Sequence, residues 1–132
     1  MYRQSRRLLV AIVSAMLSMP ASAIGQDATS SGDPRAEIDA VLVAAAPAKL
    51  LVAERFVATR EWAVDAATIG FEAPADIPGT IEIDHGTIAV SFTGPAANGN
   101  MLWLVPNDAG SGTVTWTCET TLPAELKPEG CR

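Results

Sequence analysis

The spacing of apolar residues changes once along this 132-residue chain, and this change constrains the fold more than any other feature. Before Gly70, apolar side chains recur every three or four residues, the spacing of one face of an α-helix. The residues of this face are Ile38, Val41, Leu42, Ala45, Ala48, Val52 and Phe56. After Gly70 apolar and polar residues alternate, which is typical of strands. The sequence therefore predicts one long helix followed by a sheet.

The predicted helix has a clear start and one internal irregularity. Asp33 suits the N-cap and Pro34 the first helical position. The carboxylates of Glu37 and Asp39 favour the early turns because the helix dipole is positive there. The pattern extends the helix over residues 34–62. Since Pro47 removes a backbone hydrogen bond, we expect a kink just before it or a break into two helices.

Four strands are predicted in the second half of the chain. They cover residues 80–84, 87–92, 101–105 and 113–118. His85 and Gly86 supply a tight turn between the first two strands, and Pro106 ends the third. The predicted fold class is α+β, with a long N-terminal helix packed on a four-stranded antiparallel sheet.

The first 23 residues follow the plan of a secretory signal peptide. A basic head with three arginines precedes an apolar run over residues 8–19, and small residues then lead to a cleavage site between Ala23 and Ile24. The run is shorter than the ~20 residues of a membrane-spanning helix, so we expect no stable membrane span after cleavage. An uncleaved signal anchor is the alternative, and paired arginines leave twin-arginine export open. We expect residues 24–33 to be a polar, flexible lead and residues 34–132 to form one globular domain.

The charge balance argues against nucleic acid as a partner. All fifteen acidic residues follow the signal, which contains three of the nine Lys and Arg residues, so cleavage would leave a net charge of −9. An acidic surface repels phosphate backbones and anionic lipid headgroups. A protein partner is therefore the favoured class.

The only two cysteines, Cys118 and Cys131, lie in the last fifteen residues. In an exported chain such a pair predicts a disulfide, which would pin the tail to the last strand. The chain-entropy estimate for a loop of this size is ~3 kcal/mol. A redox-active pair is disfavoured because the spacing is not Cys-x-x-Cys and Glu119 would raise the pKa of the adjacent thiol.

The sequence resembles the type IV pilin family over residues 36–132. In the second half, the residues that carry the resemblance are Gly86, Thr87, Ile88, Leu102, Leu104, Pro106, Val114, Thr115, Trp116, Thr117, Cys118, Leu122, Pro123, Pro128, Cys131 and Arg132. In the helix they are Ala46, Pro47, Ala48, Lys49, Val52, Ala53, Glu54 and Trp62. The resemblance implies a pilin-like head whose final cysteine pair is a disulfide that bounds a surface loop.

The N-terminal segment departs from the family pattern. Pilins have a short basic leader cut before a phenylalanine, and they retain an apolar helix with a glutamate at its fifth position. This chain has no Gly-Phe junction near its start and no acidic residue before Asp27. We therefore expect a pilin head without the usual N-terminal prepilin helix.

Both faces of the third predicted strand are apolar, which marks a candidate partner surface. Leu102 and Leu104 share one face, and Met101, Trp103 and Val105 share the other. If the helix covers the leucines, the other three side chains are available to a partner. The alternatives are that the disulfide-closed tail folds over them, or that the strand faces the other way.

No catalytic residue, metal or cofactor is predicted. His85 is the only histidine and has no second ligand nearby in the sequence. Glu82 and Asp84, with Asp76 upstream, lack the spacing of a calcium loop. No phosphate-binding loop or nucleophile elbow is present, so we expect a non-enzymatic protein.

Two functions follow from these observations. The first is an exported structural or interaction protein associated with a type IV pilus or a related system, for which the resemblance implies a role in adhesion. The second is a free secreted or periplasmic binding module built on a pilin head, with no filament role. Both place the protein in the periplasm or outside the cell.

Overall fold

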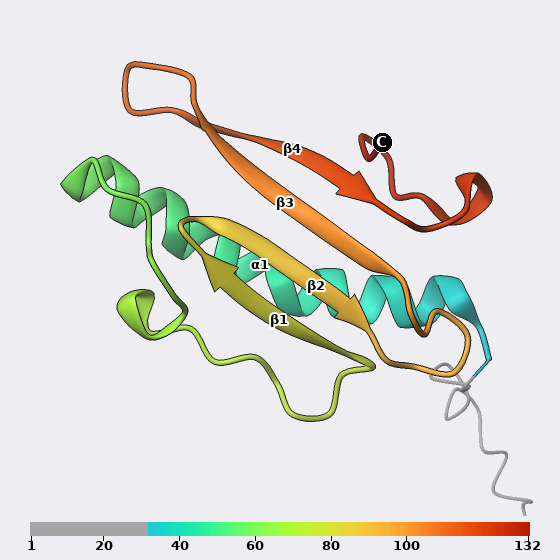
Figure 1. Cartoon of the computed structure of the whole chain (residues 1–132). Coiled ribbons are helices and arrows are strands. Elements are labelled where there is room, and N and C mark those ends of the chain that lie inside the picture. Colours follow the sequence, from blue (N-terminus) through green and yellow to red (C-terminus); the bar gives the residue numbers. More distant parts are fainter. Residues whose placement is uncertain (1–31) are drawn as a thin grey trace, which may run out of the picture.

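The structure, a computed structural model, describes residues 32–132 (Figure 1). Over this range the chain forms helix α1, four strands and two short 3-10 helices, η1 (Ala67–Ile69) and η2 (Ala124–Leu126). The predicted signal peptide, its cleavage site between Ala23 and Ile24 and most of the polar lead lie outside the described residues. These assignments stay predictions.

Helix α1 spans Pro34–Thr59 and has defined caps at both ends. The side chain of Asp33 accepts a hydrogen bond from the backbone N–H of Arg35 at 3.0 Å, which confirms the predicted N-cap. Arg60 adopts a left-handed conformation with φ of 61°, and its N–H donates to the carbonyl of Phe56. This cap ends the helix slightly before the predicted end at Trp62, because a left-handed residue cannot continue a right-handed helix.

Pro47 does not divide the helix, so the predicted break into two helices is wrong. Proline has no N–H to donate to the carbonyl of Val43, one turn earlier. Both residues are exposed, and Val43 is 74 % exposed. Because the freed carbonyl lies on the solvent side of the helix, water can replace the missing hydrogen bond.

The four strands form one antiparallel sheet in which the spatial order follows the chain order. They are β1 (Gly79–Asp84), β2 (Thr87–Phe92), β3 (Met101–Asp108) and β4 (Val114–Thr120). Helix α1 lies across one face of this sheet (Figure 1). The structure therefore confirms the predicted α+β fold.

Strand β3 continues through Pro106, so the prediction that this proline ends the strand is wrong. The backbone groups of Asn100 point toward β2 and those of Met101 toward β4, as their hydrogen bonds to Phe92 and Thr121 show. By this alternation the missing N–H of Pro106 points toward β2. The ladder between β2 and β3 ends at Leu104, so no hydrogen bond is lost there.

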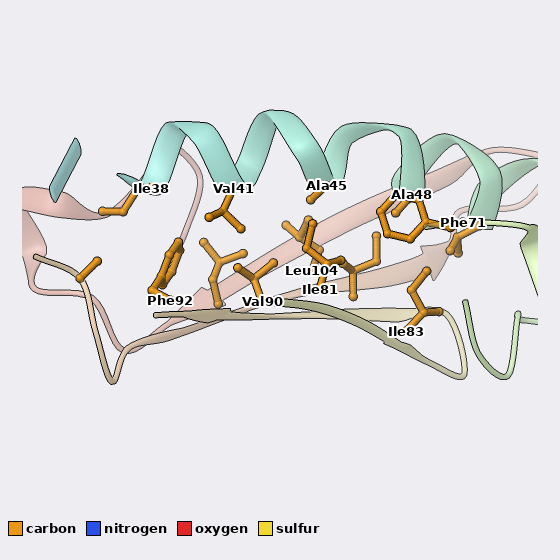
Figure 2. Packing of buried hydrophobic residues seen from close by; sticks show 14 of the residues in the cluster. Ile38, Val41, Ala45, Ala48, Phe71, Ile81, Ile83, Val90, Phe92 and Leu104 are labelled. Carbon is orange, nitrogen blue, oxygen red and sulfur yellow. The ribbon is translucent and has the colours of Figure 1, made fainter. Parts of the chain in front are cut away.

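The core lies between α1 and the inner face of the sheet. Figure 2 shows Ile38, Val41, Ala45 and Ala48 pointing from the helix toward the strands. The sheet contributes Ile81, Ile83, Ile88, Val90, Phe92, Leu102 and Leu104, all buried. The small side chains of Ala45 and Ala48 allow close approach of helix and sheet. Burial of this apolar surface is the main source of stability.

The β1–β2 hairpin turn packs against the segment that follows the helix. His85 and Gly86 have positive φ angles of 46° and 84°, which confirms the predicted tight turn. The N–H of Gly86 donates to the carbonyl of Ala63 at 2.8 Å. A Cβ on Gly86 would lie 3.0 Å from side-chain atoms of both Trp62 and Pro106. Glycine is therefore required here for close approach as well as for its backbone conformation.

Candidate interaction surfaces

The predicted partner residues lie together on the outer face of the sheet. Leu102 and Leu104 are buried on the helix side of β3. Met101, Trp103 and Val105 are half-buried on the opposite face, away from α1. We call these three residues the Trp103 surface. The facing of β3 is thus as the alternation predicted.

The tail does not cover the Trp103 surface. Leu122 is buried in the core, and Leu126 packs against the core cluster. Residues 128–131 line a cavity together with Leu42 and Ala46 of α1. The tail therefore lies on the helix side of the sheet, and the alternative that it folds over Trp103 is wrong.

The strand register places two carboxylates in one row with Trp103. Glu82 is opposite Ala89, Ala89 is opposite Trp103, and Trp103 is opposite Glu119. Both glutamates are exposed. Within residues 32–132, no Lys, Arg or His side chain forms an ion pair with either of them. The outer face thus presents one tryptophan between unpaired negative charges.

A second exposed apolar surface lies on α1, opposite the core. Val43, Leu50 and Val57 are 74 %, 60 % and 47 % exposed and are spaced by seven residues. We call them the helix stripe. A spacing of seven keeps residues on nearly the same side of a helix. In the part of the chain that the structure describes, no helix has both the length and the apolar content that a membrane crossing requires.

Sequence reasoning missed the helix stripe. The feature that could have revealed it is the seven-residue spacing of three large aliphatic residues that do not belong to the inner face of the helix. It was hidden because alanines make this helix apolar on most sides.

A cavity of about 330 Å³ separates α1 from β4 and the tail. Lys49 reaches across it from the helix, with Nζ 5.5 Å from the centre of the Trp116 ring. This distance is within the range of a cation–π interaction. The disulfide and Glu129 contribute to the tail side of the cavity.

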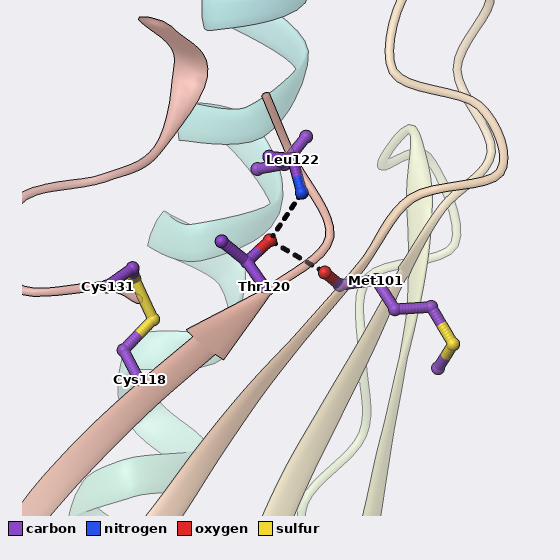
Figure 3. The surroundings of a disulfide bond; sticks show 5 residues. All are labelled: Met101, Cys118, Thr120, Leu122 and Cys131. Carbon is purple, nitrogen blue, oxygen red and sulfur yellow. Dashed lines mark hydrogen bonds between the residues drawn. A yellow bond between two sulfur atoms is a disulfide. The ribbon is translucent and has the colours of Figure 1, made fainter. Parts of the chain in front are cut away.

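The predicted disulfide between Cys118 and Cys131 is present, with a Cα–Cα distance of 4.4 Å (Figure 3). The N–H of Arg132 donates to the carbonyl of Cys118, and the N–H of Thr120 donates to the carbonyl of Arg132, both at 2.9 Å. Figure 3 also shows the Thr120 hydroxyl donating to the carbonyl of Met101 and accepting from the N–H of Leu122. The tail is therefore held at the outer edge of β4 by covalent and backbone bonds.

Glu37 is the one buried charged residue of the described core, at 6 % exposed. Its carboxylate accepts hydrogen bonds from the N–H of Ala96 at 3.1 Å and of Ala97 at 2.9 Å. These donors lie in the loop between β2 and β3. The sequence predicted only a favourable interaction of Glu37 with the helix dipole, whereas the structure shows that Glu37 anchors α1 to the loop between β2 and β3.

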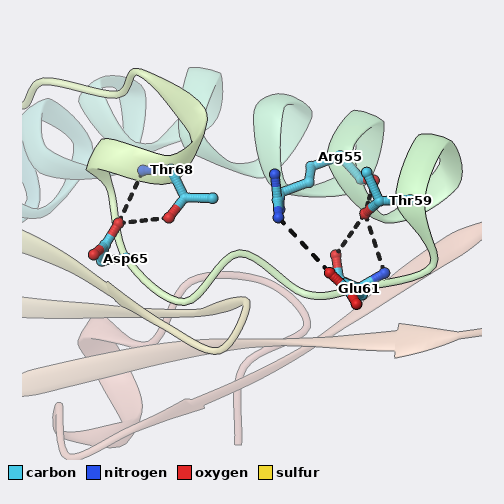
Figure 4. Close-up of polar contacts among 5 residues, drawn as sticks. All are labelled: Arg55, Thr59, Glu61, Asp65 and Thr68. Carbon is cyan, nitrogen blue, oxygen red and sulfur yellow. Dashed lines mark hydrogen bonds and ion pairs between the residues drawn. The ribbon is translucent and has the colours of Figure 1, made fainter.

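The polar contacts at the end of α1 and in the segment after it are local and join residues close in sequence (Figure 4). Asp65 accepts from the hydroxyl of Thr68 at 2.7 Å and from its N–H at 2.8 Å. These bonds, chiefly that of the hydroxyl, lower the pKa of the exposed Asp65 carboxyl. Arg55 and Glu61 form an ion pair at 4.0 Å, and Thr59 bonds the backbone nearby.

The remaining titratable residues are dispersed. His85 is exposed, and its ring Nδ1 contacts the carboxylate of the adjacent Asp84. Among residues 32–132, no three His, Cys, Asp or Glu side chains gather in a way that could hold a metal ion. Glu82 and Asp84 share the outer face of β1 and point to solvent.

Comparison with known proteins identifies the family. The family model described as pilin, of the bacterial filament, matches residues 34–132, three quarters of the chain. A comparison with individually curated proteins gives no significant match. The matched range begins at the first residue of α1 and includes the sheet, the disulfide and the tail. The chain therefore belongs to the pilin family of bacterial filament proteins.

Proposed function

We propose that this chain is an exported, non-enzymatic structural protein that associates with subunits of a type IV pilus or a related filament. Its family is structural, which supports this class of function. The N-terminal signal pattern and the disulfide both favour an oxidising compartment outside the cytoplasm. A role in adhesion is the finer form of the proposal and would follow from a place on the filament surface.

The observation that carries this proposal is the helix stripe. A helix that is apolar on both sides is typically buried on both sides. The sheet covers only the inner side of α1, and Val43, Leu50 and Val57 stay exposed on the other. Aliphatic residues at intervals of seven suit packing against another helix. We therefore assign the helix stripe as the surface that contacts neighbouring subunits.

We expect Leu50→Glu to remove the protein from pili without unfolding it. Leu50 is 60 % exposed, so the substitution should change the free energy of unfolding by less than about 1 kcal/mol. A buried charge in a subunit contact is much more costly, so association should fall by tenfold or more. The measurement is fractionation of cells into sheared pili, periplasm and medium, with a strain that lacks pili as reference.

Ala40→Glu is the matched control because Ala40 is exposed on the flank of the same helix. It introduces the same charge and should leave the distribution among fractions unchanged. The proposal is overturned if Leu50→Glu co-fractionates with pili as the unmodified protein does, or if the unmodified protein never depends on pili.

A second function, a free binding module, is favoured by the Trp103 surface. Half-buried apolar side chains on a sheet face that neither the helix nor the tail covers are available to a soluble partner. In this case the amount of the protein in the periplasm or medium would be the same in strains with and without pili. Trp103→Ala should then abolish partner capture while the melting temperature stays within a few degrees. Unfolding of this variant would instead place Trp103 in the structural core.

A further inference from the structure

Of the three tryptophans in the described part of the chain, only Trp103 has no aromatic ring or cation packed on its own ring. Trp62 stacks on Phe56 with ring centres 3.8 Å apart, and Trp116 lies under the ammonium group of Lys49. Among residues 32–132, no aromatic ring or cation packs on the ring of Trp103. Its ring is therefore available to a group from another molecule.

The groups around Trp103 select for positive charge. Glu119 is directly opposite Trp103 on β4, which places the two Cβ atoms about 5 Å apart. On the other side Ala89 is opposite Trp103, and Glu82 follows one strand further, about 10 Å from Trp103. Ala89 is small and leaves space between the ring and Glu82. A cation over the ring would thus lie between two carboxylates.

We infer that the Trp103 surface binds a basic segment of a protein partner, with an arginine or lysine side chain over Trp103 and its charge shared by Glu119 and Glu82. Tryptophan is the best aromatic partner for a cation. Met101 and Val105 flank the ring and would contact the methylene groups of such a side chain. This inference rests on the second proposed function, that the outer face binds a partner.

Other occupants are less compatible with this face. The net charge is −6, so nucleic acid and anionic lipid are repelled. A second copy docked face to face would place Glu82 and Glu119 against carboxylates of the same kind. A basic protein segment is attracted by the negative charge of the whole protein, and its central cation would pair with the carboxylates beside Trp103.

The test uses the purified chain and four acetylated, amidated peptides: tetra-arginine, tetra-lysine, tetra-glutamine and tetra-glutamate. The readout is the NMR signal of the Trp103 indole N–H, which is assigned by its loss in Trp103→Phe. Tetra-arginine should shift this signal with a salt-dependent dissociation constant, and tetra-lysine should do so more weakly. Tetra-glutamine and tetra-glutamate should leave it unchanged.

Matched variants distinguish a specific site at Trp103 from a general attraction between the acidic protein and a basic peptide. Glu119→Gln should weaken tetra-arginine binding about threefold, and the double variant with Glu82→Gln about tenfold. Glu129→Gln removes the same charge from the tail on the other side of the sheet and should change the dissociation constant by less than about 1.5-fold. All three glutamate variants keep Trp103, so the comparison does not depend on whether the fold tolerates the loss of this tryptophan.

The outcomes distinguish this inference from the second proposed function, on which it rests. An equal effect of Glu129→Gln and Glu119→Gln overturns the site, since only net charge would then matter. An equal shift with tetra-glutamine overturns the preference for a cation but supports the outer face as a binding surface. No shift with any peptide overturns the inference, while capture of a partner through Trp103 would still support the second function.

Discussion

Replacing Glu37 with alanine is expected to lower the free energy of unfolding by about 3 kcal/mol. Glu37 is 6 % exposed, and its carboxylate accepts hydrogen bonds from the N–H groups of Ala96 and Ala97. Its removal leaves two amides without an acceptor in a site where water has little access. A hydrogen bond to a charged group is also stronger than one between neutral groups. Urea denaturation followed by circular dichroism measures the change.

Two variants test whether the loss comes from this contact. Glu37→Gln keeps one acceptor oxygen and should lose about half as much as Glu37→Ala. Asp39→Ala removes an exposed carboxylate from the same part of the helix and should cost less than about 1 kcal/mol, since it changes only the dipole term. Equal losses in Glu37→Ala and Asp39→Ala would show that the buried contact contributes nothing of its own.

Gly94 offers an independent check on the same contact. A Cβ at this position would lie 2.6 Å from the carboxyl carbon of Glu37, closer than non-bonded atoms approach. Gly94→Ala should therefore displace the carboxylate and destabilise the domain in the wild-type background. In the Glu37→Ala background the clash is absent, so the substitution should cost much less.

The role of Glu37 could not be read from the sequence because its partners are remote. Ala96 and Ala97 follow it by 59 and 60 residues, and their contribution is backbone N–H groups that any residue but proline possesses. The helix and the strands were predictable because each depends on local spacing. The continuation of α1 through Pro47 and of β3 through Pro106 was not predictable. It depends on whether the backbone groups that lose a hydrogen bond face water, as at Pro47, or lie beyond the end of a ladder, as at Pro106.

The candidate surfaces were likewise predictable only in part. Alternation along β3 was enough to place Met101, Trp103 and Val105 on one face. The row that joins Trp103 to Glu119 and Glu82 depends on the register of three strand pairs, and a shift of one residue would move these side chains to the other face. The helix stripe required knowing which side of α1 the sheet covers.

Replacing Cys118 and Cys131 with serine is expected to lower the stability of the domain by about 3 kcal/mol, which is roughly 12–24 °C in Tm for a domain of about 100 residues. The bond closes the tail loop, and its loss increases the freedom of the unfolded chain. The variant also loosens the backbone bonds of Arg132 with Cys118 and Thr120. Calorimetry of the variant and of the reduced wild-type chain should give similar decreases in Tm. An unchanged Tm in both would contradict a stabilising role for the disulfide.

The same double variant separates the stability of the tail from recognition at the Trp103 surface. The tail lies on the helix side of the sheet, whereas Trp103 and Glu119 are opposite each other on the outer face through the β3–β4 ladder. This ladder also joins Val105 to Thr117 and Asn107 to Thr115, away from the tail. Below its lowered Tm, the variant should therefore bind tetra-arginine with a dissociation constant within about twofold of the wild-type value. Loss of binding in the folded variant would mean that the tail, and not the ladder alone, holds Glu119 in place.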